Sequence, residues 1–417
     1  MKENAPFRSP AEVFDWLGRF VNLEQGVMPP SMRPERMEII ARASGNPERC
    51  APAVHIAGSK GKGSITAMAG AILEEAGFRV GRYMSPHVED YRERITLGGR
   101  YFEDAIYISA GEKLREIEAL LADRAGKEYK DLLEVSDGGA AEPTFFELLT
   151  LYFFLCAEEA RCNALVVETG MGGRLDPTNI SNSAVCIITC IELEHTDMLG
   201  DTIEKIALQK AGIIKQNTPV FIARQKHKDG ADALRVFRQT AAQKNAPLFY
   251  LPEYAGISSV SVSRAGTAWN AAINGKNEMA LHSPIPGEVQ AENGTIAALA
   301  ALFAFPQVKV EHARAGLERV TLPARFEVLR REPDIIVDGA HTPLSIELGL
   351  QTWTELYGKD AVPGILIFGC AMGKDVEAMA RLLIGHFSHI IITRPGTYKI
   401  SEPEKIHEVF TRIAKET

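Results

Sequence analysis

The chain has 417 residues, enough for about two or three domains of ordinary size. Hydrophobic residues make up 46% of it and charged residues 24%, which indicates a buried globular core and excludes a disordered chain. The formal net charge of -8 argues against a nucleic-acid binder, because such proteins carry a basic surface. An anionic substrate would therefore need local positive groups to hold it.

The six cysteines are scattered, without a Cys-x-x-Cys pair. This spacing predicts buried thiols in a reducing compartment rather than disulfides or a metal site. The first residues lack the apolar stretch of a secretory signal. No uncharged run reaches the roughly 20 residues that cross a bilayer. We expect a cytoplasmic protein without a membrane or nucleic-acid partner, and we expect a monomer.

Along the chain, short apolar runs alternate with helix-like stretches, which is the pattern of a parallel α/β sheet. The predicted strands of the first part lie at 53–57, 165–168, 185–189 and 219–222. Its predicted helices lie at 64–77, 145–160, 202–212, 230–244 and 293–305. The charged segment 113–142 predicts a surface helix and loop, and the segment 255–285 predicts a small β-rich insertion.

A second α/β unit follows the segment 321–326, which we interpret as an interdomain linker. Apolar runs at 335–337, 365–368 and 390–392 predict its strands. We therefore expect a first domain over 1–320 and a smaller, Rossmann-like α/β domain over 327–417.

A glycine-rich loop connects the first predicted strand to the first predicted helix: Gly58-Ser59-Lys60-Gly61-Lys62-Gly63-Ser64. Glycines permit tight turns, and backbone N–H groups together with the positive end of a helix suit a polyphosphate. The strict P-loop pattern is not met, because Gly63 separates Lys62 from Ser64 and Ile56 occupies the first glycine position. The strand before the loop and the helix after it favour a nucleotide site over a plain tight turn. The first domain is thus predicted to be a P-loop-like, parallel-sheet ATPase.

This loop resembles that of the Mur ligase superfamily, and further segments make the chain similar to its folylpolyglutamate synthase and dihydrofolate synthase branch. The segments occur in the order that the family shows. They are Ser85-Pro86-His87, Glu93-Arg94-Ile95, Thr144-Phe145-Phe146-Glu147, the runs 168–176, 194–200 and 210–213, Pro323-Ala324-Arg325-Phe326 and Asp338-Gly339-Ala340-His341.

The resemblance implies an ATP-dependent amide ligase whose substrates are ATP, L-glutamate and a folate or dihydropteroate. ATP would phosphorylate the carboxylate of the pteroyl substrate, and the amino group of glutamate would then attack the acyl phosphate. Such a reaction needs the phosphate charge to be cancelled, two anions to be brought together, and water to be excluded.

The resemblance also implies roles for single residues. Lys62 would contact the β- and γ-phosphates, and Glu168 would bind Mg²⁺ together with Ser85 and His195. A carboxylate that ends an apolar strand, as Glu168 does, is costly unless it is paired or binds a metal. Lys210 matches a lysine that is often carbamoylated in Mur ligases, and we treat this modification as a hypothesis.

Further residues are assigned to the nucleotide and the pterin by the same resemblance. Asn293 would contact the adenine, and Arg325 would reach the γ-phosphate from the linker. Asp338 would contact the nucleotide, with His341 close to it as a further catalytic candidate. The expected pterin pocket is lined by Thr144, Phe145, Phe146, Glu147, Leu175, Asp176 and Pro177.

The sequence departs from the family pattern in four places. Ser59-Lys60 replaces Thr-Asn in the loop and adds a cation. Thr342 replaces an asparagine, and Pro177 replaces a small residue beside the expected pterin pocket. Family members continue after the last helix with a further strand-helix-strand, so the second domain looks shortened at Thr417.

Two other interpretations are compatible with parts of this pattern. One is a Mur-type ligase that joins an amino acid to a different carboxylate, although the segments at 85–87 and 144–147 favour a folate. The other is a nucleotide-binding protein without turnover. Against this second interpretation stands the joint presence of Lys62, Glu168, His195, Lys210, Arg325 and Asp338.

Overall fold

The computed structural model describes residues 5–22, 34–124, 143–273, 275–358, 364–396 and 400–416. The chain divides into two compact units. The first consists of Met1–Ser258, Asn270–Leu281 and Glu292–Thr321, and the second of Ser259–Trp269, His282–Ala291 and Leu322–Thr417. The predicted surface segment 113–142 begins within helix α4 (Asp104–Arg124), and its remainder, 125–142, lies outside the described residues.

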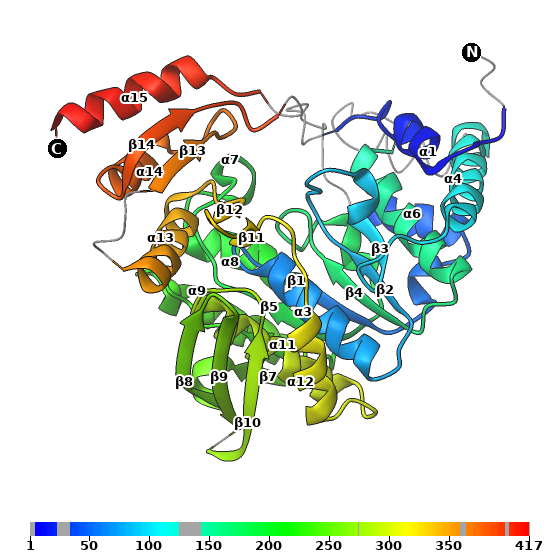
Figure 1. The fold of residues 1–417 in the computed structure, drawn as a ribbon. Helices are drawn as coiled ribbons and strands as arrows, with labels where there is room; N and C mark the ends of the chain where they lie inside the picture. Colours follow the sequence, from blue (N-terminus) through cyan, green and yellow to red (C-terminus); the bar gives the residue numbers. More distant parts are fainter. Residues whose placement is uncertain are drawn as a thin grey trace. The chain divides into compact units, whose positions relative to one another are not determined.

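A seven-stranded sheet lies in the first unit, with the strand order β3-β2-β4-β1-β5-β6-β7 (Figure 1). The strands are β1 (Ala53–Ala57), β2 (Val80–Tyr83), β3 (Ile95–Leu97), β4 (Ala164–Glu168), β5 (Ser183–Ile188), β6 (Val220–Ile222) and β7 (Leu248–Tyr250). Neighbouring strands are parallel except β2 and β3, which are antiparallel. The four predicted strands are confirmed as β1, β4, β5 and β6. The three short strands β2, β3 and β7 were not predicted.

Helices alternate with these strands and confirm the five predicted ones. The confirmed helices are α3 (Lys62–Glu75), α6 (Phe145–Glu159), α8 (Ile203–Ala211), α9 (Gly230–Gln243) and α11 (Val289–Ala304). The others are α1 (Pro10–Leu17), α2 (Pro34–Ala43), α7 (Thr196–Leu199), α10 (Leu251–Tyr254) and α12 (Val310–Arg319), with 3-10 turns at Pro47–Arg49, Tyr91–Arg94 and Pro177–Ile180. Within the described residues, every helix is too short or too polar to cross a membrane.

Two apolar cores hold helices against the central sheet. One joins α1, α4 and α6 to β4 through side chains such as Phe153 and Leu165, which are completely buried. The other joins α8 and α9 to β5 and β6 through side chains such as Ile188 and Phe237. Because helices cover the sheet so fully, β1 and β4 are buried at every position and read as continuous apolar runs.

The predicted β-rich insertion is confirmed as a three-stranded sheet with the order β10-β9-β8. Its strands are β8 (Ala255–Ser263), β9 (Gly266–Ile273) and β10 (Lys276–Ser283). Trp269 in β9 is only 2% exposed, so its large ring anchors this sheet.

From Leu322 onward, the described residues of the second unit form two small sheets and three helices. Strand β11 (Glu327–Arg330) pairs antiparallel with β12 (Ile335–Val337), and β13 (Gly364–Phe368) pairs parallel with β14 (Phe387–Ile392). The predicted strands are thus confirmed, although β12 pairs with the unpredicted β11 rather than with β13. Apolar side chains of α13 (Pro343–Tyr357), α14 (Val376–Leu383) and α15 (Pro403–Glu416) pack into one core with β13 and β14.

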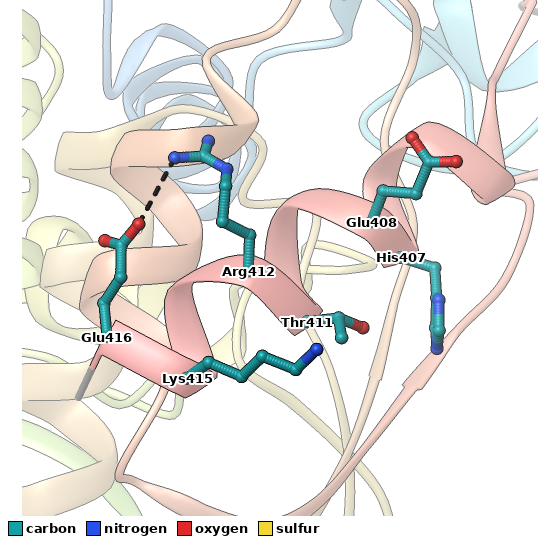
Figure 2. A pocket seen from close by; sticks show the side chains of 6 residues that line it. All are labelled: His407, Glu408, Thr411, Arg412, Lys415 and Glu416. Atoms are coloured by element: carbon teal, nitrogen blue, oxygen red, sulfur yellow. Dashed lines mark ion pairs between the residues drawn. The ribbon is translucent and has the colours of Figure 1, made fainter.

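A shallow surface pocket runs along α15 and is lined by side chains of this helix alone (Figure 2). Its residues are mostly charged, and Arg412 forms an ion pair of 3.5 Å with Glu416. None of the residues predicted for catalysis or binding belongs to it. The pocket is therefore a solvated helix face.

His55 in the middle of β1 makes the stability of the first unit depend on pH. Its Nε2 lies 3.0 Å from the hydroxyl of Thr178, which itself donates to Asp176, so Nε2 carries the proton of a neutral ring. Burial, and then the charge of Lys215, lowers the pKa of His55 to about 3. Below a pH of about 6.5, the unfolded chain binds a proton that native His55 does not bind, so the unfolding free energy falls as the pH falls.

We predict that His55→Asn weakens this acid sensitivity. The wild type should lose about 1.4 kcal/mol per pH unit through this group between pH 6.5 and 3, so between pH 7 and 5 the variant should lose about 2 kcal/mol less. Urea unfolding at both pH values measures the difference. His389→Asn, which removes an exposed histidine, should behave like the wild type. The same pH dependence in His55→Asn and the wild type would contradict the assignment.

Candidate active site

The predicted ligand residues meet at one edge of the large sheet. The glycine-rich loop follows β1, Glu168 ends β4, and Ser85 lies just beyond β2. His195 lies in the segment that follows β5. Since β2, β4, β1 and β5 are neighbours and run parallel, their carboxyl ends lie along the same edge, where α/β sheets hold their ligands.

The backbone of the loop is fastened to the segment after β5. Gly58 has a φ of +145°, and a Cβ atom there would overlap the side chain of Thr189. The N–H of Ser59 donates to the carbonyl of Cys190 at 2.9 Å, and the N–H of Lys60 reaches the same oxygen at 3.4 Å. Only glycine allows this close approach, so Gly58 fixes where the loop starts.

The second half of the loop opens helix α3. Gly61 is the N-cap of this helix with a φ of +91°, and it leaves the first-turn N–H groups for a ligand because it has no side chain. A Cβ atom on Gly61 would lie 2.9 Å from Oδ1 of Asn293, and one on Gly63 would lie 3.7 Å from Oε2 of Glu168. The structure therefore brings Asn293 and Glu168 close to the second half of the loop.

Two lysines converge on a single carbonyl oxygen of the loop. Nζ of Lys62 donates to the carbonyl of Gly58 at 2.9 Å, and Nζ of Lys210 donates to it at 2.7 Å. Lys210 also pairs with Glu194 at 3.0 Å and is only 1% exposed. The helix α8 thus supplies a buried ammonium group directly beneath the loop.

A third lysine accompanies them. Nζ of Lys60 lies 3.7 Å from Glu194 and 3.9 Å from Glu192. The loop motif alone offers no reason for a cation at this position, and the structure supplies one. Lys60 faces two carboxylates that follow β5.

These charges shift each other's ionisation. Burial disfavours the charge of Glu194, but Lys210, Lys62 and Lys60 outweigh it and lower its pKa to about 2. Burial lowers the pKa of Lys210 to about 8, and the neighbouring Glu194 opposes that change. At neutral pH Glu194 is therefore ionised, and most of Lys210 carries its positive charge.

Of the residues proposed for a metal, Ser85 and Glu168 offer the oxygen donors that suit a hard cation, whereas the imidazole of His195 is a less usual ligand for such an ion. Glu168 is 3% exposed, and its carboxylate lies beside the start of α3, where phosphate oxygens could complete a coordination shell. His195 begins α7 in a left-handed conformation with a φ of +50°. Among the described residues, no three His, Cys, Asp or Glu side chains gather into a ready-made metal cluster.

Several residues assigned to the pterin pocket also serve the fold. Thr144 and Glu147 form a capping box at the start of α6, with the N–H of Thr144 donating to Glu147 at 2.8 Å. Glu147 also forms a buried ion pair of 2.7 Å with Arg36. Phe145 is 1% exposed and belongs to the core, whereas Phe146 packs against Gly170 in the loop after β4.

In the segment 175–177, too, some side chains are engaged by the protein itself and others remain accessible. The carboxylate of Asp176 accepts hydrogen bonds from the N–H groups of Met171 and Thr178, at 2.8 and 3.0 Å. Pro177 is buried as the first residue of a 3-10 turn, and Leu175 is half-buried. The side chain of Asp176 is therefore engaged by the protein itself, and Leu175 keeps more surface for a ligand.

Within the second unit, the predicted residues lie close together. Oδ2 of Asp338 accepts a hydrogen bond from the N–H of Phe326 at 2.7 Å, and Nδ1 of His341 lies 2.7 Å from the carbonyl of Gly339. A Cβ atom on Gly339 would lie 2.7 Å from Nη1 of Arg325. The turn after β12 thus gathers Arg325, Asp338 and His341 beside one another.

Thr342, the departure next to this turn, begins a helix. It is the N-cap of α13, and its hydroxyl lies 2.9 Å from that of Ser345. Threonine is a favoured N-cap residue, so the replacement of asparagine keeps the local structure.

Three residues of the site were not predicted from the sequence: Thr189, Glu192 and Glu194. Each lies just beyond the strand β5, which pairs with β1. The sequence feature that could have identified the two glutamates is their place directly after a buried strand. Acidic residues there can act as counter-ions for the lysines of a loop that follows the neighbouring strand.

The fold and the site together define a Mur-type, ATP-using ligase. Residues 117–302 match the Mur ligase middle domain, and residues 324–416 match the Mur ligase, glutamate ligase domain. The chain is 30% identical over 386 residues to a dihydrofolate synthase/folylpolyglutamate synthase of Mycobacterium tuberculosis, which covers 89% of this chain and 76% of that protein. The chain belongs to the folylpolyglutamate synthase/dihydrofolate synthase family of Mur ligases.

Solved structures agree with this family. A folylpolyglutamate synthase of Mycobacterium tuberculosis complexed with ADP and AMPPCP matches with a TM-score of 0.82 and 27% identity, over 97% of this chain and 86% of the other. A folylpolyglutamate synthase–AMPPCP–folate complex matches with a TM-score of 0.80 and 26% identity, over 92% of this chain and 89% of the other. The predicted fold class, a parallel-sheet ATPase domain followed by a glutamate ligase domain, is thereby confirmed.

We predict that Gly58→Ala abolishes nucleotide binding by the loop. The added methyl group would overlap Thr189 and would also force alanine into a φ of +145°. Gly77→Ala is the matched control, because Gly77 has a φ of +86° but no atom lies within 4 Å of the place that a Cβ would take there. Titration of both variants with ATP measures the effect. Equal ATP affinity in the two variants would show that the contact with Thr189 is unimportant.

Proposed function

We propose that this chain uses ATP to join L-glutamate to the carboxylate of a folate or dihydropteroate. The observation that carries the proposal is the convergence of Lys62, Lys210 and Glu168 on the loop after β1, in a chain of this family. Relatives are named for both folate activities, and solved relatives hold ADP, AMPPCP and folate. These names favour a folate over the other carboxylate acceptors of Mur-type ligases.

The chemistry follows from the charges at the sheet edge. The loop N–H groups and Lys62 hold the phosphates of ATP, so that the substrate carboxylate can approach the γ-phosphorus. A carboxylate oxygen bonds to this phosphorus as the bond to ADP breaks, which gives an acyl phosphate. The amine of glutamate then attacks the acyl carbon, loses a proton and displaces inorganic phosphate. An amide remains.

We propose Ser85, Glu168 and His195 as the residues that hold Mg²⁺. Oxygen donors from a serine and a buried carboxylate suit this ion, and the phosphates of ATP would provide further ones. When bound, the ion neutralises charge on the phosphates. Ser85 and Glu168 lie at or just beyond the ends of the neighbouring parallel strands β2 and β4, and His195 lies in the segment that follows β5, which supports this assignment.

The groups around Nζ of Lys210 can be compared with those that a carbamoylated lysine would need. Its Nζ lies 2.7 Å from a carbonyl oxygen and 3.0 Å from a carboxylate oxygen, both of which attract a cation. A carbamate is an anion and would be repelled by both. These neighbours fit the ammonium group, whereas the nearby cations of Lys62 and Lys60 would suit a carbamate. We assign Lys210 the role of a cation beneath the loop, with carbamoylation as the alternative. Density for a carbamate in a crystal structure would overturn this assignment.

The remaining roles are proposals of the same kind. Asn293 is proposed to contact the adenine, because it lies beside Gly61 of the loop. Arg325, Asp338 and His341 are proposed to act on the nucleotide and the reacting phosphate, and the residues 327–417 to bind glutamate. The segments 144–147 and 175–177 are proposed to line the pterin site. We further propose a cytoplasmic monomer, with residues 321–326 as the linker after a first domain of 1–320.

The first experiment is a substrate panel that measures phosphate release. ATP, L-glutamate and either dihydropteroate or tetrahydrofolate should release phosphate, and mass spectrometry should find a product extended by one glutamate. Reactions without glutamate or without pterin are the controls. Phosphate release only with a different acceptor, such as a peptidoglycan precursor, would replace the folate proposal. ATP binding without release under any condition would indicate a protein without turnover.

We predict that Lys62→Ala lowers kcat by at least about 100-fold, because the phosphates lose a cation that acts as charge moves in the transition state. Steady-state assays with the best pterin of the panel measure the loss. Lys205→Ala, which removes a lysine that is 62% exposed on α8, should leave kcat within about twofold. Near-normal turnover by Lys62→Ala would disprove the role of the loop.

A further inference from the structure

Lys60 is a charged residue of the loop for which the reaction gives no obvious task. Its backbone N–H faces the carbonyl of Cys190, so this part of the loop is turned toward the segment after β5. Its side chain is 21% exposed and lies between Glu192 and Glu194, each 16% exposed. Lys60 is therefore held in a half-buried position by carboxylates from a distant part of the chain.

The three lysines of the loop region have different partners. Lys62 and Lys210 share the carbonyl of Gly58, and Lys210 also occupies Oε1 of Glu194. Lys60 faces the other oxygen of Glu194, Oε2, at 3.7 Å. It also lies 3.9 Å from Oε2 of Glu192. Without Lys60, both carboxylates near the loop would lose part of the positive charge that faces them.

The balance of charge shows what this loss would do. With Glu168 included, three lysines and three glutamates balance in formal charge beside the loop, and removal of Lys60 would leave one net negative charge. ATP brings several negative charges into the same region. Charges a few ångströms apart in a partly buried site interact more strongly than in water, so the less compensated carboxylates would repel the phosphates.

We propose that Lys60 is a positioning residue that neutralises Glu192 and Glu194 beside the phosphate loop and thereby sets the affinity for ATP. This inference rests on the proposed function, because it takes the loop as the ATP site. Lys60 acts through the two glutamates, and its contact with the phosphates is not required. A neutral residue at position 192 should therefore compensate for the loss of the charge at position 60.

A double-variant cycle tests the proposal by direct ATP titration of the complete chain. Lys60→Gln should raise the Kd for ATP about three- to tenfold at low salt, because the two carboxylates then repel the phosphates more strongly. The effect should shrink at an ionic strength of about 0.5 M, where the Debye length is only a few ångströms. Glu192→Gln in the same chain should return the Kd to within about twofold of the wild type.

Three controls separate this effect from a loss of structure. Lys60→Arg keeps the charge and should bind ATP like the wild type. Lys113→Gln removes another ion-paired lysine, on α4, whose Nζ lies 2.7 Å from Glu159, and should leave the Kd unchanged. In turnover assays, Lys60→Gln should raise the KM for ATP more than it changes kcat, because only nucleotide binding is affected.

Two results would overturn the inference while ATP binding by the wild type persists. A wild-type Kd in Lys60→Gln would show that the charge has no role. An undiminished loss in the Lys60→Gln/Glu192→Gln double variant would show that Lys60 contacts the phosphates directly. Failure of the wild type itself to bind ATP would instead overturn the proposed function, and the inference with it.

Discussion

The carbonyl oxygen of Gly58 is the point on which the site depends. It accepts hydrogen bonds from Lys62 of α3 and from Lys210 of α8, so two helices and the end of β1 are joined at one atom. Two ammonium groups this close repel each other, and Glu194 compensates for them by pairing with Lys210. The protein thereby holds these ammonium groups at the edge of the sheet, where a polyphosphate can replace the carbonyl oxygen as their hydrogen-bond acceptor.

The segments assigned to the pterin likewise combine structural and binding roles. Glu147 caps its own helix and pairs with Arg36 on α2, and Asp176 accepts the hydroxyl of Thr178 beneath His55. Buried carboxylates are tolerated because each accepts several hydrogen bonds. Side chains that the family motif marks as one functional group therefore divide into two kinds. Some build the walls of the site, and others, such as Phe146 and Leu175, retain surface or face the neighbouring loop.

Lys60 departs from the loop motif at a single position, but the residues that explain it, the glutamates after β5, lie far away along the chain. A lysine in place of the family's asparagine looks like an extra phosphate ligand when the loop is read alone. In the structure it faces acidic residues more than 130 positions further along the chain. Its meaning depends on the strand that pairs with β1, because that pairing brings the acidic segment to the loop.

The sequence by itself determined the long buried elements and the chemistry of the loop. Strands β1 and β4 were predicted because burial at every position leaves an unbroken apolar run, and α3 because it follows the glycines. The strands β2, β3 and β7 have three or four residues and none of them is buried at every position, whereas the equally short β6 is an unbroken buried apolar run. Pairs such as Lys210 with Gly58, 152 positions apart, were decided by tertiary structure alone. Local patterns report burial and turn geometry, whereas the partners of a buried charge depend on the order of strands in the sheet.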